Sequence, residues 1–235
     1  DTYSLEHWRA NHGVLGFAPM RMLSGTQTNL VLSIRNDWPE LVEILNKGLA
    51  AITQDEMAEL YRRWFGQDYL SRIGSRATLA AEEHSWLAEH PVLRVGINAH
   101  WAPVEFMDQA GQPQGISVAY LQRLEKLLGV RIEFVLNLTW AEAKQRLDEG
   151  RLDLLPTMAI RLDRQRSIHS TEPYLSFPVA IFSAADVAYL GDLRALAGKT
   201  VAVVRDEAPQ NWLRQDWPRL ALLPVANAQA ALRRV

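Results

Sequence analysis

The chain has 235 residues, of which 48% are hydrophobic and 22% charged, so it can bury a sizeable core in one large domain or two small ones. Its formal net charge of −2 at pH 7 provides no basic field for nucleic acid, and the absence of cysteine excludes disulfides and thiol catalysis. No apolar run approaches the roughly 20 residues that a membrane-spanning helix requires.

The first 66 residues predict a buried strand followed by two amphipathic helices. Residues 28–34 are rich in strand-forming side chains. Asp37 with Glu40, and Thr53 with Glu56, have the spacing of a helix-capping box, and apolar residues follow each pair at helical spacing.

Beyond residue 91 the chain alternates between strand and helix signals. A polar stretch and a short helix, ended by Pro91, precede this region. The expected strands lie at 93–97, 131–136, 152–156, 179–183 and 200–204, and the expected helices lie at 117–128 and after the capping box Thr139-x-x-Glu142. This alternation predicts a mainly parallel sheet, and open sheets of this kind bind small molecules beyond their strand ends.

A set of motifs occurs in fixed order through the same region. They are Trp101-x-Pro103-x-Glu105-Phe106, Gly111-x-x-x-Gly115-Ile116, Leu147-x-x-Gly150-x-x-Asp153-Leu154, Arg161-x-x-Arg164, Pro173-Tyr174 and Leu196-x-Gly198-Lys199-x-Val201. The set resembles the family 3 solute-binding proteins. The resemblance implies an α/β fold, a periplasmic-binding-protein-like two-lobed flytrap with mainly parallel sheets flanked by helices, incomplete at both ends.

The segment before the linker adds to this resemblance. Residues 36–64 are similar to the C-terminal end of the same kind of domain. The resemblance therefore implies three segments: 1–66 as the C-terminal part of a first flytrap domain, 67–90 as a linker with a short helix, and 91–235 as the N-terminal two thirds of a second flytrap domain. Lobe 1 is expected at about 91–183 and the start of lobe 2 at about 184–235. Such a tandem resembles the sensor regions of bacterial hybrid histidine kinases.

The resemblance also implies a ligand-binding set. In the family, the arginine at the place of Arg164 clamps a ligand carboxylate, a task that suits the planar fork of a guanidinium. Trp101 matches an aromatic residue that stacks on the ligand, and Thr157 matches a hydrogen-bonding threonine. The complete expected set is Trp101, Phe106, Thr157, Met158 (through its backbone), Arg161, Arg164, Arg205 and Asp206.

Four of these residues also have a plain structural interpretation. Arg164 can form a surface salt bridge, Trp101 can pack in the core, Thr157 can bond to its own backbone, and Asp206 can cap the helix expected near residue 208. Arg161 stands where the family has a threonine, which argues against a standard α-amino-acid site.

The expected function is that of a periplasmic ligand-sensing region of a transmembrane sensor histidine kinase. It would bind a small carboxylate or amino-acid-like solute between two lobes and signal by lobe closure, with a neighbouring flytrap domain and a homodimer of the full-length sensor as partners. No cofactor, metal, nucleic acid or activity of its own is expected. The alternatives are the solute-binding protein of an ABC amino-acid transporter and a dehydratase-like enzyme. In the enzyme Glu105 and Asp108 would serve as acid and base, although isolated loop carboxylates are usually solvated.

Overall fold

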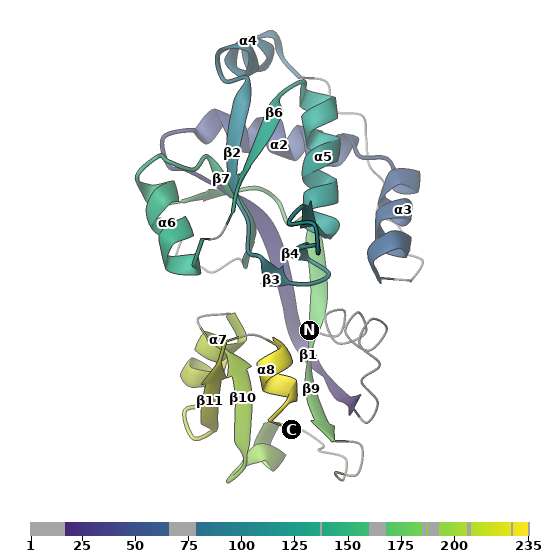
Figure 1. The fold of residues 1–235 in the computed structure, drawn as a ribbon, viewed down its shortest axis with the longest axis vertical. Coiled ribbons are helices and arrows are strands. Elements are labelled where there is room, and N and C mark those ends of the chain that lie inside the picture. Colours follow the sequence, from purple (N-terminus) through teal and green to yellow (C-terminus); the bar gives the residue numbers. More distant parts are fainter. Residues whose placement is uncertain are drawn as a thin grey trace. The chain divides into compact units, whose positions relative to one another are not determined.

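A computed structural model describes residues 17–65, 79–136, 138–159, 168–184, 187, 193–205, 208–226 and 228–234. The chain forms two compact units, one of residues 29–175 and one of residues 1–28 with 176–235 (Figure 1). Two long strands, β1 (Phe17–Ile34) and β9 (Leu175–Ala184), pair with each other and contribute residues to both units.

The unit of residues 29–175 contains most of the helices and strands. Its other elements are α2 (Pro39–Ala51), α3 (Gln54–Phe65), α4 (Ala81–Glu89), β2 (Val92–Gly96), β3 (His100–Trp101), β4 (Glu105–Met107), β5 (Pro113–Gln114), α5 (Ile116–Leu128), β6 (Arg131–Val135), α6 (Trp140–Asp148), β7 (Leu154–Ala159) and β8 (His169–Ser170).

The main sheet of this unit mixes parallel and antiparallel pairs. Its order is β6-β2-β7-β1-β8. Strand β2 is parallel to both β6 and β7, as the strand–helix alternation predicted. Strand β1 is antiparallel to β7, with Val31 opposite Met158, and antiparallel to β8. The segment before the linker therefore extends a sheet that is otherwise built from residues after it.

Both faces of this sheet are buried. Leu32 and Ile34 of β1 lie in a core with side chains of α2 and α5, whereas Val31 lies in a second core with Ala143 and Leu147 of α6. Successive residues of a strand point to opposite faces, so a strand covered on both sides reads as a continuous apolar run. The apolar stretch of residues 28–34 is explained in this way.

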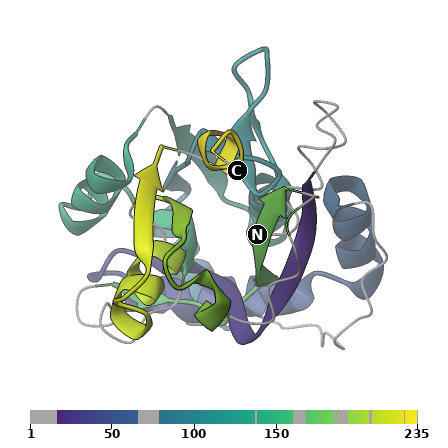
Figure 2. The same cartoon turned by 90° about the horizontal axis from the view of Figure 1, so that it is seen from below.

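The other unit contains a parallel pair of strands. Strand β10 (Thr200–Val204) runs parallel to β11 (Ala221–Val225), and both contact α7 (Ala208–Asp216) and α8 (Ala228–Leu232) (Figure 2). The short 3-10 helix η1 (Leu193–Leu196) supplies two of the buried side chains. The core consists of Leu193, Leu196, Val203 and Leu213.

The compact units differ from the expected division of the chain. Residues 29–65 pack with residues 79–175 because β1 pairs with β7 and because the apolar face of α2 shares a core with α5. The division between the compact units falls at 175/176, within the start of β9, whereas the lobe boundary near 183/184 stays a prediction. The assignment of residues 1–66 to a preceding flytrap domain remains a prediction.

Two of the three expected capping boxes are confirmed. Thr53 and Glu56 exchange backbone-to-side-chain hydrogen bonds, and Thr139 caps α6 together with Glu142. The prediction for Asp37 was wrong. Trp38 is the residue that precedes α2, and the Asp37 carboxylate instead accepts two hydrogen bonds from Arg35, both of 2.5 Å.

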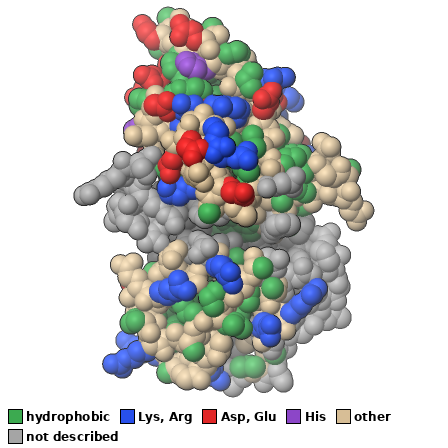
Figure 3. All heavy atoms as spheres, turned by 60° about the vertical axis from the view of Figure 1, so that its left-hand side comes forward, with side chains coloured by type: hydrophobic (Ala, Val, Ile, Leu, Met, Phe, Trp, Pro, Cys, Tyr) green, Lys and Arg blue, Asp and Glu red, His purple; other side chains and the backbone are tan. Residues whose placement is uncertain are grey.

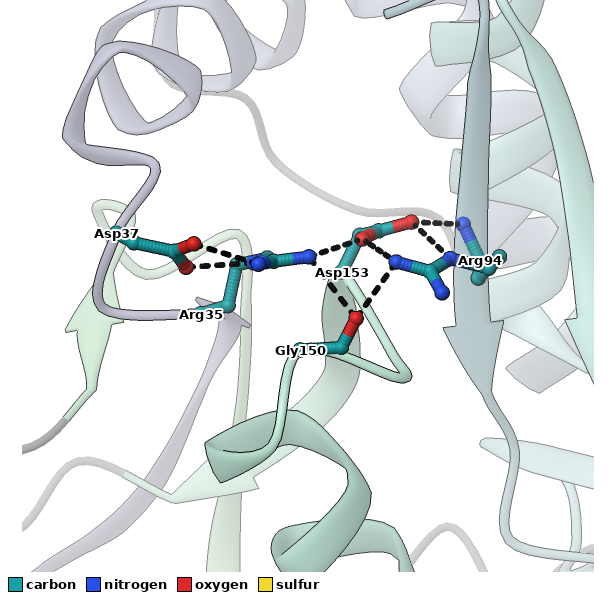
Figure 4. Close-up of polar contacts among 5 residues, drawn as sticks. All are labelled: Arg35, Asp37, Arg94, Gly150 and Asp153. Atoms are coloured by element: carbon teal, nitrogen blue, oxygen red, sulfur yellow. Dashed lines mark hydrogen bonds and ion pairs between the residues drawn. The ribbon is translucent and has the colours of Figure 1, made fainter.

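The Asp153 carboxylate joins three stretches of this unit (Figure 4). Asp153 is fully buried, and Arg94 of β2 donates to it from Nη2 at 2.6 Å, from Nε at 3.0 Å and from its backbone N–H at 2.7 Å. Arg35, which directly follows β1, donates from Nη1 at 3.3 Å. Both guanidinium groups also donate to the Gly150 carbonyl, at 2.8 Å and 3.0 Å.

The backbone conformation at this place favours glycine at position 150. Its φ of +66° lies in the left-handed region that favours glycine, and a Cβ there would lie 2.5 Å from Nη2 of Arg35. The motif Gly150-x-x-Asp153 therefore supplies the hydrogen-bond acceptors for two arginines. One of them, Arg35, belongs to the segment before the linker.

Asp153→Asn is expected to lower the free energy of unfolding by roughly 3 kcal/mol, because two guanidinium groups lose a buried anionic acceptor. Urea unfolding measures the loss. Asp37→Asn is the matched control, since its carboxylate bonds the same Arg35 from an exposed position and its loss is expected to cost less than about 1 kcal/mol. Equal losses in the two variants would contradict the role assigned to Asp153.

Candidate functional site

A small antiparallel sheet, β3-β4-β5, carries three of the residues in the Trp101–Phe106 motif. Trp101 of β3 lies opposite Glu105 of β4, and His100 lies opposite Phe106. Phe106 in turn pairs with Gln114 of β5. The two predicted aromatic residues share one short stretch of sheet, but because successive residues of a strand alternate between faces, Trp101 lies on the same face as Glu105 and Phe106 on the opposite face.

The start of α5 fixes the loop before Glu105. The backbone N–H of Ile116 donates to the Pro103 carbonyl and that of Ser117 to the Val104 carbonyl, both at 3.0 Å. Gly115 precedes the helix with a φ of +119°, and a Cβ there would lie 2.3 Å from the Val104 carbonyl oxygen. Two of the N–H groups that a helix start leaves free are thus used to hold the chain itself.

Glu105 is buried at the centre of this arrangement. Its residue exposure is 1%, and its Oε1 accepts hydrogen bonds from the Thr157 hydroxyl at 2.5 Å and from the Asn98 backbone N–H at 3.2 Å. Its Oε2 is also buried and has no hydrogen-bond partner among the described residues. Burial raises the pKa of Glu105 to about 8, against the opposing effect of the two hydrogen bonds. The expectation that this carboxylate is solvated was therefore wrong.

Tyr174 holds strand β7 beside Glu105. The Tyr174 hydroxyl lies 2.8 Å from the Pro156 carbonyl oxygen and 2.9 Å from Oγ of the buried Ser117 in α5. Burial raises the pKa of Tyr174, so its hydroxyl stays protonated and remains a donor. The contact fixes the residue directly before Thr157, which explains the place of Tyr174 in the motif set.

Five of the eight expected binding residues lie among the described residues. Trp101 pairs with Glu105 across the small sheet, Phe106 directly follows Glu105 in β4, and the Thr157 hydroxyl is hydrogen-bonded to the Glu105 carboxyl group. The side chain of Met158 is 3% exposed and lies in the core on the α6 side of the sheet, so only its backbone remains available for the expected role. Arg205 is exposed at the end of β10 in the other unit, where its backbone N–H donates to the Val225 carbonyl at 2.9 Å.

The remaining three expected residues, Arg161, Arg164 and Asp206, lie outside the described residues. Their assignment to the ligand site stays a prediction.

Trp64 is a neighbour of the site that the sequence did not indicate. Its ring lies edge-to-face with that of Phe106, with centroids 6.1 Å apart and an interplanar angle of 82°. Trp64 belongs to α3, which was expected in another domain, so no spacing along the chain links it to Phe106. Only the three-dimensional packing of α3 reveals the contact.

Asp108 is a turn residue. Its Oδ1 accepts from the backbone N–H groups of Ala110 and Gln112, both at 2.8 Å, and its Oδ2 accepts from the Gln114 side chain at 3.2 Å. These hydrogen bonds, above all that from Gln112, lower the pKa of Asp108. Asp108 therefore stabilises the turn between β4 and β5, a role that sequence reasoning did not assign to it.

Other features of the described residues bear on the kind of site. On the unit of residues 29–175, Figure 3 shows Lys and Arg side chains beside Asp and Glu side chains, without a face of one sign in that view. Across the part of the chain that the structure describes, no group of three or more His, Asp or Glu residues is placed to hold a metal ion. Nor is any helix in that part long and apolar enough to span a membrane.

The fold and the motifs define a solute-binding protein of the extracellular type. The model of the bacterial extracellular solute-binding proteins, family 3, matches residues 93–232. Because this match covers more than half of the chain, the chain belongs to that family.

Curated relatives extend the similarity outside those residues. The virulence sensor protein BvgS of Bordetella bronchiseptica is 27% identical over 215 residues, which cover 92% of this chain and 17% of the relative. The sensor protein EvgS of Escherichia coli K12 is 23% identical over 212 residues, which cover 90% of this chain and 18% of the relative. The chain thus spans about a sixth of the length of these sensor proteins.

Solved structures agree with the flytrap fold. The periplasmic VFT2 domain of BvgS from Bordetella pertussis superposes with a TM-score of 0.55 at 25% identity, over 67% of each chain. An ancestral amino-acid-binding protein, AncCDT-1, described as a precursor of cyclohexadienyl dehydratase, gives a TM-score of 0.55 at 23% identity, over 65% of this chain and 68% of its own. The expected fold class is confirmed.

Glu105→Gln is expected to flatten the pH dependence of stability. Between pH 4.5 and about 8 the folded protein holds the Glu105 proton and the unfolded chain does not. The free energy of unfolding therefore falls as pH rises through this window, by about 1.4 kcal/mol per pH unit from this group. Urea unfolding at several pH values, with each variant compared with the unsubstituted protein, measures the slope.

Asp108→Asn is the control for this experiment. Its half-buried carboxylate has a lowered pKa and is ionised in both states across the same window, so this variant should keep the slope. A Glu105→Gln variant with an unchanged slope would show that Glu105 is ionised in the folded protein.

Proposed function

We propose that the chain is part of the periplasmic ligand-sensing region of a transmembrane sensor histidine kinase. The region binds a small carboxylate or amino-acid-like solute between the two lobes of a flytrap domain and signals by lobe closure. It has no catalytic activity of its own, and its partners are a neighbouring flytrap domain and a second copy of the full-length sensor.

The extent of the similarity to sensor proteins carries this proposal. The family model covers residues 93–232, the ligand-binding module alone. The alignments with BvgS and EvgS cover 92% and 90% of the chain, so they include much of the segment before residue 93 as well. A separate transport protein has one module, so it would not be expected to be similar to a sensor in the segment before residue 93.

The proposed mechanism rests on the two lobes that membership of the family implies. Closure of a two-lobed domain around a solute is a shift of population towards a state in which both lobes contact the ligand. The described half of the expected site, around Trp101 and Thr157, lies in one unit, whereas Arg205 lies in the other. A ligand that contacts both groups would favour the closed state.

The direct test uses the intact natural protein that contains this chain, in membranes. ATP-dependent autophosphorylation that changes when the expected ligand-binding residues are substituted would support a sensor kinase. A natural protein without kinase activity, encoded beside transport genes, would instead favour the ABC transporter component.

A dehydratase-like enzyme is a second candidate, favoured by one observation. A buried carboxyl group with a pKa of about 8, such as that of Glu105, is protonated at neutral pH and can act as a general acid. Turnover of a hydroxy-cyclohexadienyl acid that Glu105→Gln abolishes would support this candidate, and the absence of turnover in the intact protein would contradict it.

Arg164→Ala is expected to weaken the binding of a carboxylate ligand by roughly 2–4 kcal/mol, the scale for losing one partner of a desolvated charge pair. Isothermal titration calorimetry measures the change. Arg151→Ala is the matched control, because Arg151 is an exposed arginine that pairs only locally with Glu149 among the contacts described for it. An affinity that Arg164→Ala leaves unchanged would remove Arg164 from the ligand site.

Trp101 is expected to change its fluorescence when ligand binds, because stacking on a ligand alters the surroundings of the indole ring. The chain has eight tryptophans, so the signal must be assigned by substitution. Trp101→Phe should remove most of the ligand-dependent change in a fluorescence titration. Persistence of the full change in this variant would place Trp101 outside the site.

A further inference from the structure

The small sheet β3-β4-β5 has different neighbours on its two faces. Trp101 and Glu105 lie opposite each other across β3 and β4, so their side chains share one face, and Phe106, the next residue of β4, lies on the other. On the first face the Glu105 carboxyl group is hydrogen-bonded to the Thr157 hydroxyl of β7. On the second face the Phe106 ring meets that of Trp64 in α3, with centroids 6.1 Å apart. One short strand therefore connects the expected ligand side with α3.

Trp64 lies where α3 ends. It is the last residue but one of that helix, so its contact with Phe106 lies close to the point where the chain leaves α3 for the expected linker. The start of α3 is attached elsewhere, because Arg123 of α5 forms ion pairs with Glu56 and Glu59, at 2.8 Å and 3.2 Å. The two ends of α3 thus have different anchors, and the anchor at Trp64 belongs to the small sheet.

The pairing of β4 ties the two faces of the sheet together. Glu105 pairs with Trp101 of β3, and the adjacent Phe106 pairs with Gln114 of β5. A displacement of Trp101 or Glu105 is therefore carried to the Phe106 backbone. The edge-to-face contact of two aromatic rings depends on their relative position, so such a displacement changes how Phe106 packs on Trp64.

We propose that Phe106 is a positioning residue that links the ligand-binding face of the small sheet to the end of α3. A ligand packed against Trp101 then acts, through the contact between Phe106 and Trp64, on the segment that leads into the linker. The inference rests on the proposed ligand-sensing function. It gives Phe106 a role in transmitting the signal, in place of the ligand contact that the resemblance implies.

Hydrogen–deuterium exchange in the intact natural protein, followed by mass spectrometry, tests the link without a ligand. Phe106→Leu should speed amide exchange in the last turn of α3 by about 2- to 10-fold, the factor that corresponds to one aromatic pair. Thr157→Val removes the hydrogen bond on the opposite face of β4 and should also speed exchange in that turn. In the Phe106→Leu background it should add nothing, and this non-additivity is the evidence for coupling.

Trp86→Leu is the matched control for the exchange measurement. It removes an edge-to-face aromatic pair of the same kind, that of Trp86 in α4 with Trp38, whose centroids are 5.2 Å apart. This variant should speed exchange in α4 and leave the last turn of α3 unchanged. If Thr157→Val does not alter exchange in that turn, or alters it equally in the Phe106→Leu background, the inference is overturned.

Autophosphorylation of the intact protein in membranes tests the role in signalling. The probes are the common L-amino acids and the carboxylates that lack their amino group, first screened by thermal shift. Phe106→Leu should still bind a stabilising probe, but the probe should no longer change autophosphorylation. Phe106→Tyr restores the ring and should restore the response. Loss of probe binding in folded Phe106→Leu would show that Phe106 is a ligand contact and would overturn the inference.

The two measurements separate the inference from the proposed function. If a probe changes autophosphorylation equally in the unsubstituted protein and in Phe106→Leu, the proposed function stands and the inference is overturned. If exchange shows the coupling but no probe changes autophosphorylation, the link between the small sheet and α3 stands and the proposed function fails.

Discussion

The buried carboxylate of Asp153 holds together the unit that carries the site. It accepts hydrogen bonds from Arg94 of β2 and from Arg35 at the end of β1. Both arginines also donate hydrogen bonds to the carbonyl of Gly150. Burying an anion is costly unless donors surround it, and here two guanidinium groups and a backbone N–H do so. Because the three strands β1, β2 and β7 meet at this point, their register is set by one ionic centre as well as by their apolar faces.

The site follows from this scaffold. Asp153 directly precedes β7, and Thr157 lies four residues further along. The Tyr174 hydroxyl fixes the intervening Pro156, while the start of α5 holds the loop that brings Glu105 beneath Thr157. A buried carboxyl group with a raised pKa lowers the free energy of unfolding as pH rises, because the unfolded chain loses its proton first.

The sequence predicted the elements better than it predicted their partners. Strand β10 has the expected bounds, and the helix-capping boxes at Thr53 and Thr139 are present. The parallel pairing of β2 follows from the strand–helix alternation. Local spacing could not show that the Asp37 carboxylate would accept hydrogen bonds from Arg35 and so would not cap the helix. Nor could it show that a loop carboxylate such as Glu105 is enclosed, because that burial depends on contacts with β7 and α5, which are distant in sequence. Trp64 was missed for the same reason.

Small-angle X-ray scattering of the intact natural ligand-binding region tests the central claim, lobe closure around a solute, most directly. The experiment compares the radius of gyration without ligand and with a compound that raises the melting temperature, since such a compound binds the folded state. The account predicts a smaller radius of gyration at saturation, which substitution of Arg164 or Thr157 should reverse at the same ligand concentration. A compound that stabilises the protein and leaves the scattering curve unchanged would contradict signalling by closure.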